Sequence, residues 1–252
     1  MSLPDILLLL SAAFGAGILN TIAGGGTFLT FPALVFVGIP PVVANATSTV
    51  AVLPGYLGGA LGYRTEVAAF DRRQFIRLTL IALLGGAVGA GLLLISSDAA
   101  FSALVPFLLL IATLVFLFGQ RVRDFAARHA KGVTPFGFVG MFLVSIYGGY
   151  FNGGLGIILL ALFALWGMTN IHQMNGLKTA MSFILSVISV AIFAGAGIIE
   201  WTAGLMMMVA STLGGYAGAP ISRALPMPVI RAVIGAVGFI MSAVFFWRVF
   251  LA

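Results

Sequence analysis

The feature that most constrains this chain is a run of eight long apolar segments joined by short connections. About 20 apolar residues are enough to cross the hydrocarbon core of a bilayer. Only 7% of the 252 residues are charged, whereas a soluble domain averages about 25%. The segments lack the alternation typical of strands, so the spans are predicted to be helical. The sequence predicts an all-α integral membrane protein with about eight transmembrane helices, at residues 3–38, 42–63, 74–95, 100–119, 136–168, 173–197, 202–222 and 229–250.

The N-terminal sequence MSLPDILLLLSAAFGAG has no basic residue before its apolar run. We therefore expect a retained first span rather than a cleaved signal peptide. The chain has no cysteine, which excludes disulfides, thiolate metal sites and cysteine catalysis, and we expect neither a cofactor nor a metal. The net charge of +6 comes mostly from two short loops, so the expected partner is the lipid bilayer and not nucleic acid.

These two basic loops predict the orientation in the membrane. They carry Arg64, Arg72, Arg73 and Arg77, and then Arg121, Arg123, Arg128 and Lys131. The positive-inside rule places both loops in the cytoplasm. Eight crossings would then place both termini there as well, in a multi-pass protein of the plasma (inner) membrane. Nine of the twelve Lys and Arg residues, Arg248 included, would lie on the cytoplasmic face.

Glycines interrupt the first apolar segment. As a single helix, residues 3–38 would be about 54 Å long, against a hydrocarbon core of about 30 Å. The interruption reads AGGGT at residues 23–27, and the fifth segment has a similar cluster, NGGLG, at residues 152–156. Each segment is either a span followed by a short re-entrant helix or a tilted, broken helix. The sequence leaves this choice open.

An offset of about 130 residues aligns the two halves, pairing Asn45 with Asn175 and Thr49 with Thr179. It also places GGAVGA at residues 85–90 over GGYAGA at residues 214–219. We interpret this as a duplication, with a first transmembrane repeat at 1–119, a basic cytoplasmic linker at 120–134 and a second repeat at 135–252. Each half would contribute four crossings, and an even number predicts parallel rather than inverted repeats.

The two glycine clusters are candidates for a binding site, because matching glycine-interrupted segments often mark the site of a transporter. Irregular backbone survives inside a membrane only where it is buried in protein or lines a wet cavity. The amino end of a half-helix has unpaired N–H groups and a partial positive charge, so it can hold an anion. Close helix packing is the alternative use of small residues. We assign that role to GGAVGA, GGYAGA, Gly55, Gly58 and Gly59.

Charged residues are nearly absent from the predicted spans. All six carboxylates fall in loops or at segment ends, whereas a cation transporter usually needs acidic residues within the membrane. Lys178 lies inside a span and is a candidate for substrate binding, although a lysine near a helix start can also snorkel to the interface. His172 and Lys178 are the candidates for proton coupling. The alternative for His172 is an interfacial histidine without a role.

Uncharged polar residues gather near the breaks, where hydroxyl and amide groups can donate hydrogen bonds to oxyanions. Some of these serine and threonine residues are expected only to cap helices or to bond to the preceding turn. The candidate substrate-binding residues are Asn20, Thr21, Gly24, Gly25, Gly26, Thr27, Asn45, Thr47, Ser48, Thr49, Asn152, Gly153, Gly154, Gly156, Asn175, Lys178 and Thr179.

The chain resembles the sulfite exporter TauE/SafE family, also grouped as the toluenesulfonate uptake permeases. The likeness rests on NTIAGGGTFLTFPALVFVGIPPVVANATSTVAVLPGYLGGALGYR at residues 20–64, and on YGGYFNGGLG and MNGLKT in the second half. It implies a duplicated four-helix unit and a secondary transporter of sulfite, sulfonates, sulfoacetate or related anions. It also suggests a site at Ala23–Thr27, Asn45–Thr49, Asn152–Gly156 and Asn175–Thr179.

The residues and the resemblance together favour a secondary transporter of small sulfur-containing or organic anions, with its site between the two repeats. Proton coupling is an option, and sulfite itself titrates near neutral pH. A passive anion channel and a membrane assembly subunit that transports nothing are the alternatives. An enzyme is disfavoured, because the one histidine near a span has no evident acidic partner. The direction of transport and a homo-oligomeric state are left open.

Overall fold

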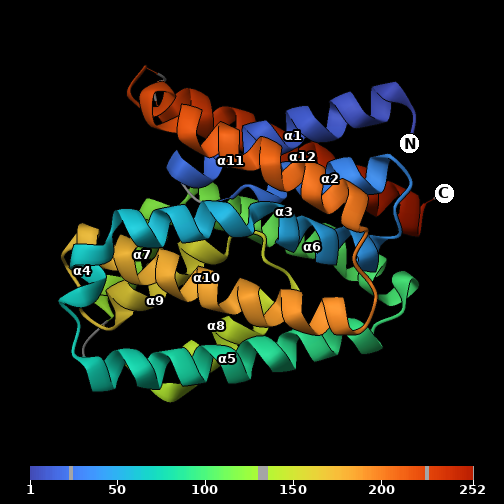
Figure 1. Cartoon of the computed structure of the whole chain (residues 1–252). Helices are drawn as coiled ribbons and strands as arrows, with labels where there is room; N and C mark the ends of the chain where they lie inside the picture. Colours follow the sequence, from blue (N-terminus) through green and yellow to red (C-terminus); the bar gives the residue numbers. More distant parts are fainter. Residues whose placement is uncertain (23–24, 130–135, 225–226, 252) are drawn as a thin grey trace.

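The computed structural model describes residues 1–22, 25–129, 136–224 and 227–251. All regular elements in these ranges are α-helices, most of them long and packed side by side (Figure 1). The all-α prediction is therefore confirmed.

The helices of the first half follow the predicted segments. They are α1 (Leu3–Ile22), α2 (Thr27–Phe36), α3 (Pro41–Gly62), α5 (Arg72–Ile95) and α6 (Asp98–Leu117), with α4 (Arg64–Ala68) and α7 (Gly119–Arg128) in the two basic connections. Those of the second half are α8 (Phe138–Tyr150), α9 (Leu155–Leu165), α10 (Ile171–Gly195), α11 (Trp201–Ala224) and α12 (Met227–Phe250). By length and composition α1, α5, α6 and α10 can each cross a membrane, and both glycine clusters interrupt a helix as predicted.

Local sequence explains where several helices begin. Asp71 caps α5 by accepting a hydrogen bond of 2.9 Å from the backbone N–H of Gln74. Asn170 caps α10 by accepting from the N–H groups of His172 and Gln173. These side-chain oxygens satisfy donors that the start of a helix leaves unpaired.

The helices on the two sides of each glycine cluster run in opposite directions. After the first cluster, α2 runs back along α1, so that a Cβ at Gly15 would lie 3.1 Å from Leu29 Cδ1. With the turn at the second cluster, α9 runs back along α8, so that a Cβ at Gly140 would lie 2.7 Å from Leu162 Cδ1. The two broken segments are therefore helical hairpins.

Helices that occupy the same place in the two halves meet as antiparallel pairs. On α3 and α10, Gly59 faces Thr179, while the earlier Tyr56 and the later Ser186 bond to one common side chain, Asn152. Contacting residue numbers thus fall along one helix as they rise along the other. The pair α3 and α10 is antiparallel.

The pair α6 and α12 repeats this pattern. Thr113 faces Gly238, and Ser242 donates a hydrogen bond of 2.7 Å to the carbonyl of Pro106. The halves also exchange partners, because α1 packs along α11 while α8 packs along α5. Two copies of one helix can be antiparallel neighbours only when the repeats are inverted.

The parallel arrangement expected from an even number of crossings is therefore wrong. Each half has a hairpin that returns to the end at which it began, followed by three long helices, and three is an odd number. Both termini accordingly lie at one end of the molecule, at the right in Figure 1, while the connection from α3 through α4 to α5 lies at the opposite end.

The motifs GGAVGA and GGYAGA lie where helix backbones touch. A Cβ at Gly89 would lie 2.1 Å from the carbonyl oxygen of Ile146 on α8, and one at Gly214 would lie 2.0 Å from that of Phe14 on α1. These contacts exclude any side chain larger than hydrogen, which confirms the packing role assigned to the two motifs. In the predicted linker, α7 packs against α9, and residues 130–135 lie outside the described ranges.

Candidate substrate site at the two helix breaks

One side chain holds the first break. Asn20, near the end of α1, accepts hydrogen bonds through Oδ1 from the backbone N–H groups of Gly25 at 3.0 Å and Gly26 at 2.8 Å. These glycines precede α2, where a helix start leaves N–H groups unpaired. The other atom of the amide, Nδ2, is buried and has no hydrogen-bond partner among the described residues.

Hydroxyl groups extend from this break to α3. Thr30 on α2 and Ser48 on α3 share a hydrogen bond of 2.6 Å. Thr27 Oγ1, at the first residue of α2, is buried and without a partner in the described part of the chain. An unsatisfied buried polar group costs about 1–3 kcal/mol and calls for an explanation. The first break has two such groups, on Asn20 and Thr27.

The second break is built differently. Gly154 has a φ of 73°, in the left-handed region that favours glycine, and α9 begins directly after it. Asn152 is buried: its Oδ1 accepts a hydrogen bond of 3.0 Å from the hydroxyl of Tyr56 on α3, and its Nδ2 donates one of 3.1 Å to Ser186 on α10. Asn152 therefore fixes this break between α3 and α10.

Two backbone groups at the second break are also engaged. The N–H of Leu155 donates to the carbonyl of Asn152, and the carbonyl of Gly153 accepts from the hydroxyl of Tyr147. The N–H groups of Gly25 and Gly26 at the first break are likewise occupied. At the first break, the buried side-chain donors without a partner among the described residues are Nδ2 of Asn20 and the hydroxyl of Thr27.

The middle of α3 lies between the two breaks. A Cβ at Gly55 would lie 3.5 Å from Nδ2 of Asn20, and the next residue, Tyr56, reaches Asn152. Consecutive residues of a helix point about 100° apart, so the breaks approach one turn of α3 from two sides. Two segments distant in sequence thus form one region.

One face of α10 continues this region. It carries hydroxyls at spacings of three and four, on Thr179, Ser182, Ser186 and Ser189. The methyl group of Thr179 touches Gly59, and Ser186 meets Tyr56 through Asn152, so the face is turned to α3. The hydroxyls of Ser182 and Ser189 are buried and unpartnered within the described ranges. We call this contact, with its row of hydroxyls, the α3–α10 seam.

Some residues of the stretch Asn45–Thr49 serve helix packing, and others belong to the candidate site. Asn45 donates a hydrogen bond of 2.9 Å to the carbonyl of Tyr150, and its buried Oδ1 has no partner among described residues. Thr47 accepts from the backbone N–H of Glu200, and Thr49 bonds to the carbonyl one turn before it. Thr47 thus joins α3 to the residue that precedes α11, while Thr49 bonds back within its own helix, as expected for part of this set.

Lys178 lies where the second hairpin meets α10. Its Nζ donates a hydrogen bond of 3.0 Å to Oδ1 of Asn175, and a Cβ at Gly156 would lie 3.3 Å from its Cδ. It forms no ion pair with a described residue. Thr179 bonds to carbonyls of its own helix. His172 is exposed in the first turn of α10, and the structure does not bring it to the breaks.

Two predicted site residues are not placed, and two further residues join the site. Gly24 lies outside the described residues, and the side chain of Thr21 is not described. Tyr56 and Ser186 are not among the predicted residues, although the offset of about 130 that pairs Asn45 with Asn175 pairs them as well. Extending the alignment along α3 would have found both.

The site is therefore electrically neutral apart from Lys178. All six carboxylates lie at helix ends or in connections. No group of three or more metal-ligating side chains occurs in the described ranges. Buried amide and hydroxyl donors without partners are suited to an oxyanion.

The chain is similar to several proteins that are named as probable membrane transporters. The chain is 31% identical over 95% of its length to a "probable membrane transporter protein" of Haemophilus influenzae, and covers 94% of that protein. It is 28% identical to "probable membrane transporter protein ORF9" of a Sinorhizobium species, over 88% of this chain and 85% of that protein. It is 26% identical to "probable membrane transporter protein YfcA" of Escherichia coli, over 90% and 84% respectively. No solved structure matches the chain.

The match to a family extends over nearly the whole sequence. The sequence model of the sulfite exporter TauE/SafE family covers residues 9–245, from the second turn of α1 to most of α12. The chain therefore belongs to the sulfite exporter TauE/SafE family of membrane transporters.

Proposed function

We propose that this protein is a secondary transporter of small sulfur-containing or organic anions of the sulfite, sulfonate or sulfoacetate type. Its substrate site lies where the two breaks meet α3 and continues along the α3–α10 seam, between repeats at 1–119 and 135–252. The family supports the transporter class.

The observation that carries the proposal is the set of unsatisfied donors at this place. Nδ2 of Asn20 and the hydroxyls of Thr27 and Ser182 are buried and unpartnered among the described residues. A bound oxyanion would satisfy them, and each hydrogen bond to a charged group is worth about 1.5–3 kcal/mol. A cation would lack a counter-charge there, because no carboxylate lies in the middle of a long apolar helix.

Because the two broken segments are hairpins, we propose a different position for the termini from the one that eight full crossings predict. With the basic connections in the cytoplasm, both termini lie on the outer face of the plasma membrane. Ten of the twelve Lys and Arg residues then lie in or beside cytoplasmic connections: Arg64, Arg72, Arg73, Arg77, Arg121, Arg123, Arg128, Lys131, Arg223 and Arg231. Eight full crossings would give nine, so the inverted arrangement satisfies the positive-inside rule better.

Proton coupling, where it operates, would use Lys178. Its amine lies beside the second hairpin and bonds to a neutral partner, Asn175, so that no described carboxylate holds its proton in place. His172 is the second candidate, at the cytoplasmic start of the same helix.

The substitution Asn20→Asp tests the site. The carboxylate keeps an oxygen for the N–H groups of Gly25 and Gly26 but replaces the unpaired Nδ2 donor with a second acceptor. We would measure uptake of sulfite, sulfoacetate and sulfate into proteoliposomes after a pH jump. Wild type should show saturable flux of at least one sulfur anion. The variant should lose at least about tenfold in apparent affinity or rate, the equivalent of one hydrogen bond to a charged group.

Asn170→Asp is the matched control, because Asn170 is exposed and caps α10, a position where aspartate serves equally well. Thr27→Val tests the same site without adding charge and should also reduce flux. If no anion shows saturable flux in wild type, the transporter proposal fails. If both site variants transport like wild type, transport stands and the assignment of the site fails.

A further inference from the structure

Two grooves on the outside of the helix bundle are equivalent under the internal repeat. The first runs between α5 and the start of α8, and is lined by Arg73, Ile76, Arg77, Leu80, Ile81, Leu84 and Phe138. The second runs between α1 and α11, and is lined by Leu10, Ser11, Phe14, Met206, Val209, Ala210 and Leu213. The offset of 129 that pairs Gly85 with Gly214 also pairs Arg77, Leu80, Ile81 and Leu84 with Met206, Val209, Ala210 and Leu213. The fold itself therefore creates both grooves.

The two grooves differ in charge. The α5–α8 groove has two arginines at its mouth, where the α1–α11 groove has Thr202 and Met206 at the matching positions. Their volumes are about 330 Å³ for the α5–α8 groove and about 460 Å³ for the α1–α11 groove, so the basic groove is the smaller of the two. What sets it apart is cationic charge at one end of an apolar surface.

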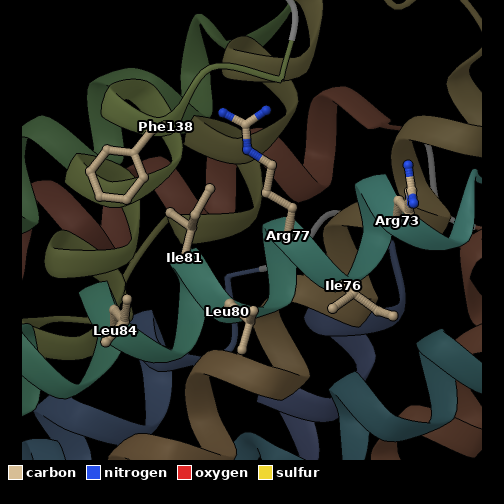
Figure 2. Close-up of a pocket in the computed structure, with 7 residues that line it drawn as sticks. All are labelled: Arg73, Ile76, Arg77, Leu80, Ile81, Leu84 and Phe138. Atoms are coloured by element: carbon tan, nitrogen blue, oxygen red, sulfur yellow. The ribbon is translucent and has the colours of Figure 1, made fainter.

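The geometry of the basic groove separates a polar end from an apolar floor. Figure 2 shows Arg73 and Arg77 on the first turns of α5, with Leu80 and Leu84 further along the helix and Phe138 across from Ile81. Leu80 and Leu84 are 55% and 59% exposed, which in a membrane protein means exposed to lipid. Neither arginine forms a hydrogen bond or ion pair with a described residue, so both guanidinium groups are available to an outside anion.

We propose that the α5–α8 groove is a binding site for an anionic phospholipid of the surrounding bilayer. An acyl chain lies along Leu80, Leu84 and Phe138, and the phosphate of the headgroup bonds to Arg73 and Arg77. Arginine suits this role because its planar fork of donors matches the oxygens of a phosphate. Basic pockets between helices at the cytoplasmic face typically bind such headgroups.

The repeat explains why one groove has this specificity. Inversion places the α5–α8 groove in the leaflet beside the basic connections and its counterpart in the opposite leaflet. Of the two grooves, only the α5–α8 groove carries arginines, so the proposed site for an anionic lipid lies in one leaflet. Whether that leaflet is cytoplasmic depends on the proposed orientation, but lipid binding by the purified protein does not.

The test uses wild-type protein purified in detergent and titrated with phosphatidylglycerol or with phosphatidylcholine of the same acyl chains, with bound lipid counted by native mass spectrometry. The double variant Arg73→Gln/Arg77→Gln removes both cations, and Arg64→Gln/Arg72→Gln is the matched control, which removes the same charge at the same end but outside the groove. We expect wild type and the control to prefer phosphatidylglycerol, and the groove variant to lose about 30-fold of that preference, which is about 2 kcal/mol at about 1 kcal/mol per arginine. Equal binding of the two lipids by wild type, or equal losses in both variants, would overturn the proposal.

A second measurement leaves the arginines intact. Because the chain has no cysteine, Leu80→Cys can carry a single fluorophore in the basic groove, with Leu213→Cys as its counterpart in the neutral one. In nanodiscs of phosphatidylcholine, a small fraction of nitroxide-labelled phosphatidylglycerol should quench the label at position 80 several-fold more than the label at position 213. Equal quenching at the two positions would show that the arginines select no lipid.

Discussion

The hydroxyl of Tyr56 donates a hydrogen bond of 3.0 Å to Oδ1 of Asn152, a residue 96 positions later in the chain. This bond joins the middle of α3, in the first half, to the break between α8 and α9 in the second. Through the same asparagine it reaches Ser186 on α10, so that one buried amide links three elements from both halves of the chain.

Tyr56→Phe should destabilise the protein by about 1–3 kcal/mol, because a buried acceptor on Asn152 loses its donor. Thermal unfolding in detergent measures the effect. Tyr216→Phe removes the same hydroxyl from a side chain that is 88% exposed, and it should leave the melting temperature unchanged. Equal melting temperatures for the two variants would contradict this role of the Tyr56–Asn152 bond.

Gly89→Ala should disrupt the contact between α5 and α8. Its Cβ would lie 2.1 Å from a backbone oxygen of Ile146, which cannot move aside as a flexible side chain could. We expect a loss of about 1–3 kcal/mol or more, as for other overpacked positions. Gly91, half a turn further along α5, has nothing within 4 Å. Gly91→Ala should therefore be neutral or slightly stabilising, since alanine is the better helix former. Thermal unfolding of the two variants in detergent measures the difference, and equal melting temperatures would contradict the role of Gly89 in this contact.

Labelling of single cysteines distinguishes hairpins from full crossings. Ser2→Cys and Ala196→Cys should react with a membrane-impermeant maleimide added outside intact cells, and Ala69→Cys should react only after permeabilisation. Eight full crossings would place positions 2 and 196 in the cytoplasm beside position 69. Protection of both from the outside reagent would therefore refute the orientation that we propose.

Lys178→Gln should reduce anion flux driven by a pH gradient by roughly tenfold, the equivalent of about 1.4 kcal/mol. Exchange of labelled for unlabelled anion without a gradient should be affected less, if the amine carries the coupled proton rather than only attracting the substrate. Arg248→Gln removes one positive charge at the other end of the molecule and serves as the control. A variant in which both fluxes match wild type would leave Lys178 as a lysine that snorkels to the interface.

Much of this architecture could be predicted from the order of residues. Apolar length, glycine clusters and the two basic loops predict membrane helices and their approximate ends, because each depends on local composition. The packing role of GGAVGA and GGYAGA was equally predictable, since only glycine allows backbones to touch. Asn20, Asn45, Asn152 and Lys178 were singled out by position or by repeat, and the structure places them on the elements around the two breaks.

What the sequence could not determine is how the pieces meet. A broken apolar segment has the same composition whether it crosses the membrane or turns back, so counting segments gave parallel repeats, whereas the antiparallel contacts of α3 with α10 require inverted ones. Tyr56 and Ser186 acquire their meaning only through Asn152, which no local pattern connects to either. The sequence determines which residues must leave water. Only tertiary packing decides which of the buried donors find a partner within the chain, and Nδ2 of Asn20 is one that finds none among the described residues.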